Sequence, residues 1–231
     1  MAEEEKVDIN KLASKVFDVL DDYSPYSSFL DQSTLSNVDE WIDTGSKMLN
    51  AVISGSLYGG IPKGRVTLLA GESASGKSFI AQKIVGNAQK MGMYTVVFDT
   101  ENAIDARMVE SLGADPKKIK YFPAKSIEQV RNAIFALLQK IEETHMEGKF
   151  LVVIDSLANM LSEMETKRMD KDSTSADMGT IAKAIKSLLK TCTTYGGLTK
   201  TTFVVTNHIY DNPNEMYPDL VKCMNLSLIH I

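Results

Sequence analysis

Unbroken apolar runs alternate with segments of helical periodicity along the chain from residue 65 onward. The apolar runs predict five strands, which span residues 65–70, 94–99, 119–123, 150–155 and 201–206. Apolar residues that recur every three to four positions predict four helices, at residues 76–90, 104–112, 126–143 and 177–193. Continuous apolar strands separated by helices are typical of a mostly parallel sheet that helices cover on both faces. The pattern therefore indicates an α/β fold.

The first 37 residues follow a different pattern. Residues 1–24 predict a short amphipathic helix, because apolar side chains lie at near-helical spacing at Val7, Leu12, Val16, Val19 and Leu20. Residues 23–37 are rich in Ser and other turn-forming residues, which is typical of a linker. We therefore expect an acidic N-terminal arm and linker over residues 1–37 and an α/β core over residues 38–231.

Charge is distributed unevenly between these parts. The net charge is −5, but residues 1–60 hold eleven acidic and four basic residues, so the remainder carries +2. A mildly basic body is compatible with a nucleic-acid partner.

The two cysteines, Cys192 and Cys223, are too few for a disulfide framework. No apolar run approaches the roughly 20 residues that span a bilayer, and the acidic start is no signal peptide. A cytoplasmic protein with no membrane partner is expected.

One loop has the spacing of a phosphate-binding motif. It fits the pattern G-x-x-x-x-G-K-[ST], follows a predicted strand and opens a predicted helix. Small residues let backbone N–H groups curl around phosphate oxygens, and the helix N-terminus adds positive potential. The lysine would reach the terminal phosphates, and the hydroxyl after it would bind Mg²⁺. The alternative is a plain turn with an exposed lysine. The loop comprises Gly71, Glu72, Ser73, Ala74, Ser75, Gly76, Lys77 and Ser78.

Two carboxylates follow predicted strands. Asp155 ends the run FLVVID and is the expected Mg²⁺-shell carboxylate, although an acid there could also cap a helix. Glu101 follows the run that ends in Asp99 and lies at the carboxyl edge of the predicted sheet. There it could orient a water molecule for attack on a phosphate. The alternative for Glu101 is a solvated loop acid.

A further polar pair, Asn207 and His208, follows the fifth predicted strand. A polar side chain at that edge could contact the γ-phosphate and report its presence. Spacing alone does not distinguish this sensing role from an ordinary histidine at a strand end.

These sites, in this order, resemble the RecA-type recombinase core, and in particular the phage UvsX-type recombinases. The blocks that carry the resemblance are GGIPKGRVTLLAGESASGKS, VVFDTENAID, RMVESLGAD, VVIDSLANM and VVTNHIYD. The resemblance implies a RecA-like P-loop ATPase core and an N-terminal arm that packs on a neighbouring subunit. It also implies an ATP- and Mg²⁺-dependent protein that forms filaments on single-stranded DNA and promotes pairing and strand exchange with duplex DNA.

The resemblance also assigns roles to individual residues. Glu101 becomes the catalytic carboxylate, assisted by Lys77, and His208 becomes the γ-phosphate sensor. Lys167, Arg168 and Lys171 lie in the segment that corresponds to a first DNA-binding loop, although nearby acids also fit a simple solvated loop. Met108 stands where relatives commonly carry an aromatic residue that stacks on adenine. Mediator and single-strand-binding proteins are expected partners.

The chain stops before a second DNA-binding loop, further strands and basic residues that would reach a neighbour's ATP. We therefore expect a truncated reading frame. Two other functions remain open at this stage. One is a RecA-fold replicative helicase, against which the block FDTENAID argues. The other is a non-catalytic mediator that uses ATP as a switch, against which intact Lys77, Glu101 and Asp155 argue.

Overall fold

The computed structural model describes residues 9–33, 35, 37–164, 178–211 and 222–224. Contacts divide the chain into two compact units, Met1–Asn37 and Val38–Ile231. In the first unit, helix α1 (Ile9–Phe17) continues into a 3₁₀ turn, η1 (Asp18–Leu20). The ring of Phe17 packs edge-to-face against that of Phe29, with centroids 5.9 Å apart. Several apolar side chains of this unit are nevertheless more than half exposed, among them Val16, Val19, Leu20 and Leu30.

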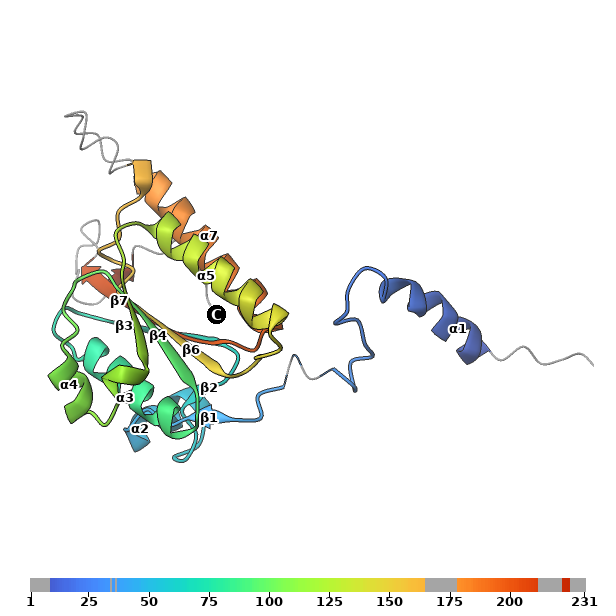
Figure 1. Ribbon diagram of the computed structural model, residues 1–231, viewed down its shortest axis with the longest axis horizontal. Coiled ribbons are helices and arrows are strands. Elements are labelled where there is room, and N and C mark those ends of the chain that lie inside the picture. Colours follow the sequence, from blue (N-terminus) through green and yellow to red (C-terminus); the bar gives the residue numbers. More distant parts are fainter. Residues whose placement is uncertain (1–8, 34, 36, 165–177, 212–221, 225–231) are drawn as a thin grey trace, which may run out of the picture. The chain divides into compact units, whose positions relative to one another are not determined.

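The second unit is built on a central sheet with five parallel strands (Figure 1). Their order is β3-β7-β6-β4-β5, and each strand is parallel to its neighbours. A short sixth strand, β8 (Lys222–Met224), pairs with β7 in the antiparallel sense. The expected α/β fold is confirmed. The parallel strands are β3 (Val66–Gly71), β4 (Tyr94–Asp99), β5 (Ile119–Pro123), β6 (Phe150–Asp155) and β7 (Thr202–Asp211).

Helices cover both faces of this sheet (Figure 1). Helices α5 (Ile127–Glu143) and α7 (Met178–Leu198) lie on one face, and α3 (Lys77–Lys90) and α4 (Ala106–Ser111) lie on the other. Successive residues of a strand point to opposite faces. Accordingly, Val152 and Ile154 of β6 belong to the core beneath α5 and α7, whereas Leu151 and Val153 belong to the core beneath α3. Two-sided burial explains why these strands read as continuous apolar runs.

The segment before the phosphate loop contains elements that the sequence pattern did not predict. Strands β1 (Trp41–Ile42) and β2 (Ile61–Pro62) form a two-residue antiparallel pair, and helix α2 (Lys47–Ser54) lies between them in the chain. Asn50 of α2 is fully buried and organises this segment. Its side-chain oxygen accepts hydrogen bonds from Thr44 N and Oγ1, at 3.0 and 2.7 Å. Its Nδ2 donates to Asp43 Oδ1 at 2.8 Å and to the Leu57 carbonyl at 3.2 Å.

Several predicted elements differ in length from those observed. Strand β7 runs to Asp211 instead of ending at residue 206, and helix α7 runs to Leu198 instead of residue 193. Of the predicted N-terminal helix, the structure describes only the part from Ile9. Within the described ranges, no helix combines the length and apolar character needed to cross a membrane.

Candidate active site

The phosphate loop joins the end of β3 to the start of α3, as the sequence predicted. Gly76 caps the helix in the left-handed conformation, with φ 88°, which side chains rarely adopt. Gly71 lies close to the Ser75 side chain, because a Cβ atom at Gly71 would lie 2.7 Å from Ser75 Oγ and the hydroxyl would have to rotate away. Ala74 also has a positive φ, of 61°. These angles curl the loop tightly, so the N-terminus of α3 opens onto the cavity that the loop encloses.

The side chain of Lys77 folds back over the loop and is only 8% exposed. Its Nζ donates hydrogen bonds to the carbonyl oxygens of Gly71, at 3.0 Å, and Glu72, at 2.7 Å. It also lies 3.4 Å from Nδ1 of His208. An ammonium group is therefore held at the centre of a loop whose shape suits phosphate oxygens.

Asp155 ends β6 and faces the same cavity. It is 5% exposed, and its Oδ1 accepts a hydrogen bond from Thr206 Oγ1 of the neighbouring strand β7 at 2.5 Å. Ser78, the second residue of α3, lines the cavity together with Asp155. A hydroxyl and a carboxylate are oxygen donors of the kind that Mg²⁺ accepts alongside phosphates and water. The chemistry of this pair therefore fits a magnesium ion.

Glu101 lies in the turn after β4, and the buried Asp99 holds that turn. Asp99 accepts from Glu101 N at 2.9 Å and from Ile104 N at 3.1 Å. The Glu101 side chain is fixed separately, because its Oε1 accepts from Ser156 Oγ at 3.0 Å and from Asn159 Nδ2 at 2.7 Å. The backbone of Glu101 is thus positioned by the last residue of β4, and its carboxylate by residues that follow β6.

Thr100 fixes this turn to the end of β6. Its hydroxyl oxygen accepts from Ser156 N at 2.9 Å and lies 3.0 Å from the Ser156 carbonyl, to which it donates. The backbone N–H of Thr100 donates to the Asp155 carbonyl at 2.8 Å. The ends of β4 and β6 therefore continue to pair beyond the sheet, and they keep the Glu101 turn in register with Asp155.

His208 connects the phosphate loop with Glu101. In the sheet it pairs with Gly71, the first residue of the loop. Its Nε2 lies 3.4 Å from Glu101 Oε1, while Nδ1 faces Lys77. Asn207 is not brought to the cavity, because successive strand residues point to opposite faces. Its amide is buried and has no hydrogen-bond partner among the described residues.

One cavity of about 280 Å³ joins most of the predicted site residues. The residues that line it are Ser73, Ala74, Ser75, Gly76, Lys77, Ser78, Phe79, Glu101, Asp155 and His208. Gly71 and Glu72 contribute carbonyl oxygens to Lys77. The predicted DNA contacts lie outside the described residues, namely Lys167, Arg168 and Lys171.

The sequence reasoning missed the residues that hold these groups in place: Asp99, Thr100, Ser156, Asn159 and Thr206. A signal for them was present, since each is a polar residue at or just beyond the carboxyl end of a predicted strand. Carboxyl ends of parallel strands share one edge, so such residues meet there. Their partners could not be assigned without the strand order.

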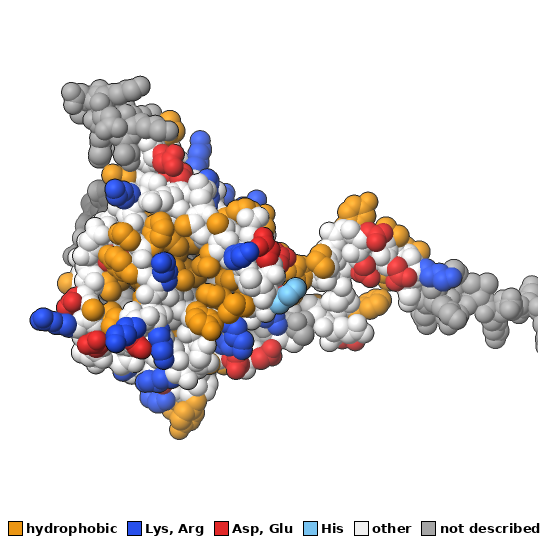
Figure 2. All heavy atoms as spheres, in the orientation of Figure 1, with side chains coloured by type: hydrophobic (Ala, Val, Ile, Leu, Met, Phe, Trp, Pro, Cys, Tyr) orange, Lys and Arg blue, Asp and Glu red, His pale blue; other side chains and the backbone are white. Residues whose placement is uncertain are grey.

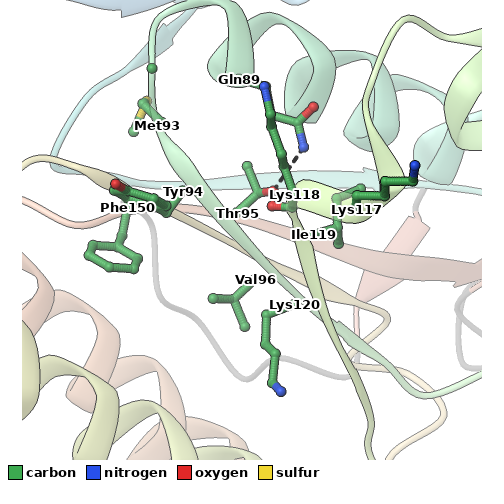
Figure 3. Close-up of a pocket in the computed structure, with 11 residues that line it drawn as sticks. Gln89, Met93, Tyr94, Thr95, Val96, Lys117, Lys118, Ile119, Lys120 and Phe150 are labelled. Atoms are coloured by element: carbon green, nitrogen blue, oxygen red, sulfur yellow. Dashed lines mark hydrogen bonds between the residues drawn. The ribbon is translucent and has the colours of Figure 1, made fainter.

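A second, larger cavity of about 590 Å³ lies at the opposite end of the sheet (Figure 3). Its apolar surface comes from residues at the start of β4 and β6, including Tyr94 and Phe150, whose rings are 5.4 Å apart. Lys117, Lys118 and Lys120 line it from the turn before β5 and from β5 itself. Figure 2 shows lysine and arginine side chains interspersed with apolar side chains over one face of the molecule. This groove combines positive charge with aromatic surface.

The strand, the glycine-containing loop and the helix that follows it define the P-loop class of α/β proteins. The family model described as the RecA N-terminal domain matches residues 28–219, and the chain belongs to that family. The resemblance noted in the sequence is thereby confirmed.

Curated relatives agree with this assignment. The chain is 30% identical over 200 residues to a "Recombination and repair protein" of Enterobacteria phage T4, covering 86% of this chain and 50% of the relative. It is 29% identical over 176 residues to "Protein RecA" of Chlorobium chlorochromatii, covering 76% and 46%. For "Protein RecA" of Mycoplasma genitalium the identity is 28% over 201 residues, covering 83% and 56%. The chain spans about half the length of the curated relatives it matches.

Proposed function

We propose that this chain is the nucleotide-binding part of an ATP-dependent homologous-recombination protein, which forms filaments on single-stranded DNA and pairs it with duplex DNA. The observation that carries the proposal is the convergence of Lys77, Glu101, Asp155 and His208 on the cavity formed by the phosphate loop. The names of the relatives, "Recombination and repair protein" and "Protein RecA", support the biological setting.

Different residues of the chain bind ATP and promote its hydrolysis. The backbone N–H groups of the loop and the Lys77 ammonium bind the phosphates. Ser78 and Asp155 hold Mg²⁺, which when bound neutralises charge on the phosphate oxygens. Glu101, fixed by Ser156 and Asn159, orients a water molecule for attack on the γ-phosphorus and accepts its proton, while the bond from that phosphorus to the bridging oxygen breaks and ADP leaves.

His208 links the nucleotide-binding cavity to the central sheet. Its two ring nitrogens face Lys77 and Glu101, so a change in the contacts of either residue alters the contacts of the imidazole. His208 belongs to β7, which lies between β3 and β6. We assign it the role of γ-phosphate sensor on that basis, and we assign none to Asn207.

The DNA contacts of the filament are proposed for Lys167, Arg168 and Lys171. Three phosphate contacts give a slope of only about −2 in log affinity against log salt, because each contributes about −0.7. Binding of single-stranded DNA by these residues alone is therefore expected to be weak at physiological salt. A titration of labelled single-stranded DNA at several salt concentrations measures this slope directly. The protein would act in the cytoplasm, with mediator and single-strand-binding proteins as partners.

The arm of residues 1–37 is proposed to pack on the core of a neighbouring copy. Its described part combines exposed apolar side chains with acidic residues, such as Asp18, Asp21 and Asp22. The groove at the start of β4 and β5 offers the complementary lysines and aromatic rings. Charge and apolar character thus match between the two surfaces.

Nucleotide calorimetry tests the proposal. Lys77→Ala should weaken binding of Mg²⁺–ATP by at least about ten-fold, because a charge-assisted contact contributes roughly 1.5–3 kcal/mol. The matched control is Lys140→Ala, which removes a lysine from the exposed face of α5 that pairs with Glu143. Equal ATP affinity for Lys77→Ala and the parent chain would refute the assignment of the phosphate loop.

A further inference from the structure

Phe79 is an aromatic residue placed where the candidate site is otherwise polar. It is the third residue of α3, directly after Ser78, and it lines the cavity of the phosphate loop. Its side chain is 54% exposed. A large apolar side chain left in water loses the free energy that burial would provide, so an exposed phenyl ring at a ligand cavity marks a surface available for covering.

The other groups of the cavity account for phosphates and metal but not for a base. Lys77, Ser78, Asp155 and Glu101 offer charges and hydroxyls, and the His208 ring faces Lys77 and Glu101. Among the described lining residues, Phe79 is the one that offers a hydrocarbon ring. It leaves α3 within one helical turn of Lys77, because two residues advance a helix by about 3 Å.

We propose that Phe79 is the surface on which the nucleobase of the bound nucleoside triphosphate packs. This inference rests on the proposed function, in which the loop holds the phosphates of the same ligand. Packing of a base against a ring depends on the area of the base's π face and not on the hydrogen-bonding groups at its edge. The site therefore favours purine over pyrimidine nucleotides but discriminates little between ATP and GTP.

Calorimetry with the 231-residue chain separates the base from the phosphates. The ligands are ATP, GTP, CTP and inorganic tripolyphosphate, each with Mg²⁺. Phe79→Ala should weaken ATP and GTP by about 5- to 150-fold, the range for loss of one base–aromatic contact. Tripolyphosphate affinity should stay unchanged, and Phe79→Tyr should retain ATP affinity. Tyr58→Ala is the matched control, because Tyr58 is an aromatic residue that is 86% exposed and does not line this cavity.

A fluorescence readout reports contact between ring and base. The chain contains one tryptophan, Trp41, so Phe79→Trp adds a second whose signal is obtained by subtracting the parent. ATP should quench that signal, whereas tripolyphosphate should not.

The possible failures are distinguishable. If tripolyphosphate binds and Phe79→Ala leaves ATP affinity unchanged, the base contact is overturned while the phosphate loop stands. Equal losses of ATP and tripolyphosphate in Phe79→Ala would also overturn it, because the change then acts on the loop. Loss of ATP affinity in Met108→Ala but not in Phe79→Ala would assign the base to α4 instead. A parent chain that binds neither ATP nor tripolyphosphate would overturn both proposals.

Discussion

The Oε1 atom of Glu101 lies 3.4 Å from Nε2 of His208, although the two residues are 107 positions apart in the chain. Glu101 follows β4 and His208 belongs to β7, and these strands flank β6. The contact therefore spans the end of the strand that carries Asp155. Both ring contacts of His208 are satisfied when Nε2 donates to Glu101 and Nδ1 accepts from the Lys77 ammonium.

This relationship leads to a prediction for Glu101. In a form of the protein that hydrolyses ATP, Glu101→Gln should lower turnover by about 10²- to 10⁴-fold, the usual contribution of a positioned general base. ATP affinity should be retained, because the proposed phosphate contacts come from the loop and Lys77. Steady-state ATPase rates and nucleotide calorimetry measure the two effects. Hydrolysis at the parent rate would transfer the catalytic role to another residue.

Thr206 should be important for stability through Asp155. Thr206→Val removes the hydroxyl that donates to the buried carboxylate at 2.5 Å. We expect a loss of about 1–3 kcal/mol in the free energy of unfolding, because one buried acceptor loses its donor. The control is Thr194→Val on the exposed side of α7, which should change stability by less than about 0.5 kcal/mol. Urea denaturation followed by circular dichroism provides both values, and equal stability of the two variants would contradict the prediction.

Two adjacent glycines of α7 should respond oppositely to alanine. A Cβ atom at Gly196 would lie 2.5 Å from Cε2 of the buried Phe203, whereas one at Gly197 would meet nothing within 4 Å. Gly196→Ala should therefore destabilise the protein by about 1–3 kcal/mol through overpacking. Gly197→Ala should stabilise it by about 0.5–1 kcal/mol, because alanine favours a helix more than glycine does.

Thermal unfolding of the Gly196→Ala and Gly197→Ala variants beside the parent gives the sign of each effect. Destabilisation of the same size in both would show that the packing of α7 against β7 does not discriminate the two positions.

The reactivity of the Cys192 thiol should report unfolding of the protein. Burial raises its pKa to about 12, so the thiol stays protonated in the folded protein at neutral pH. The folded-state pKa lies above the unfolded value. Its contribution to stability is therefore complete below about pH 8.5 and is lost as the pH rises toward 12.

Labelling with a thiol reagent checks this prediction. In a Cys223→Ser variant at pH 8, Cys192 should react only at the rate at which the protein opens, and denaturant should accelerate the reaction strongly. A Cys192→Ser variant gives the background. Rapid labelling of the folded chain would show that the thiol is accessible.

For β4, β5 and β6 the predicted and observed limits coincide. In β4 and β6 the unbroken apolar runs reflect burial on both faces, whereas β5 is a partly exposed edge strand that contains Lys120. Strand β7 was predicted too short, since its polar end pairs with Ala70 and Gly71 of β3 and such pairing leaves no mark in local hydropathy. Helix α7 continues through Gly196 and Gly197, although local sequence patterns associate glycine with the end of a helix. The packing of Gly196 beneath Phe203 overrides that preference.

The sequence singled out the charged residues that line the cavity, but not the hydrogen bonds that hold them in place. A fixed spacing marked Lys77 and Ser78, and strand ends marked Glu101 and Asp155. The face to which each strand-end residue points depends on a register that one sequence does not show, so Asn207 and His208 were treated alike. The hydroxyl contacts of Thr100 and Thr206 cross between strands. They depend on a strand order that differs from the order along the chain.

That strand order also determines when the sheet can close during synthesis. Strand β7 is made after the other four parallel strands, yet it lies between β3 and β6 and pairs with both. In a chain leaving the ribosome, β4, β5 and β6 can pair as they emerge, while β3 has no strand to pair with among them. Domains tend to fold as units once their sequence is available. The phosphate loop at the end of β3 can therefore acquire its final setting only after β7 (Thr202–Asp211), the strand that pairs with β3, has been synthesised.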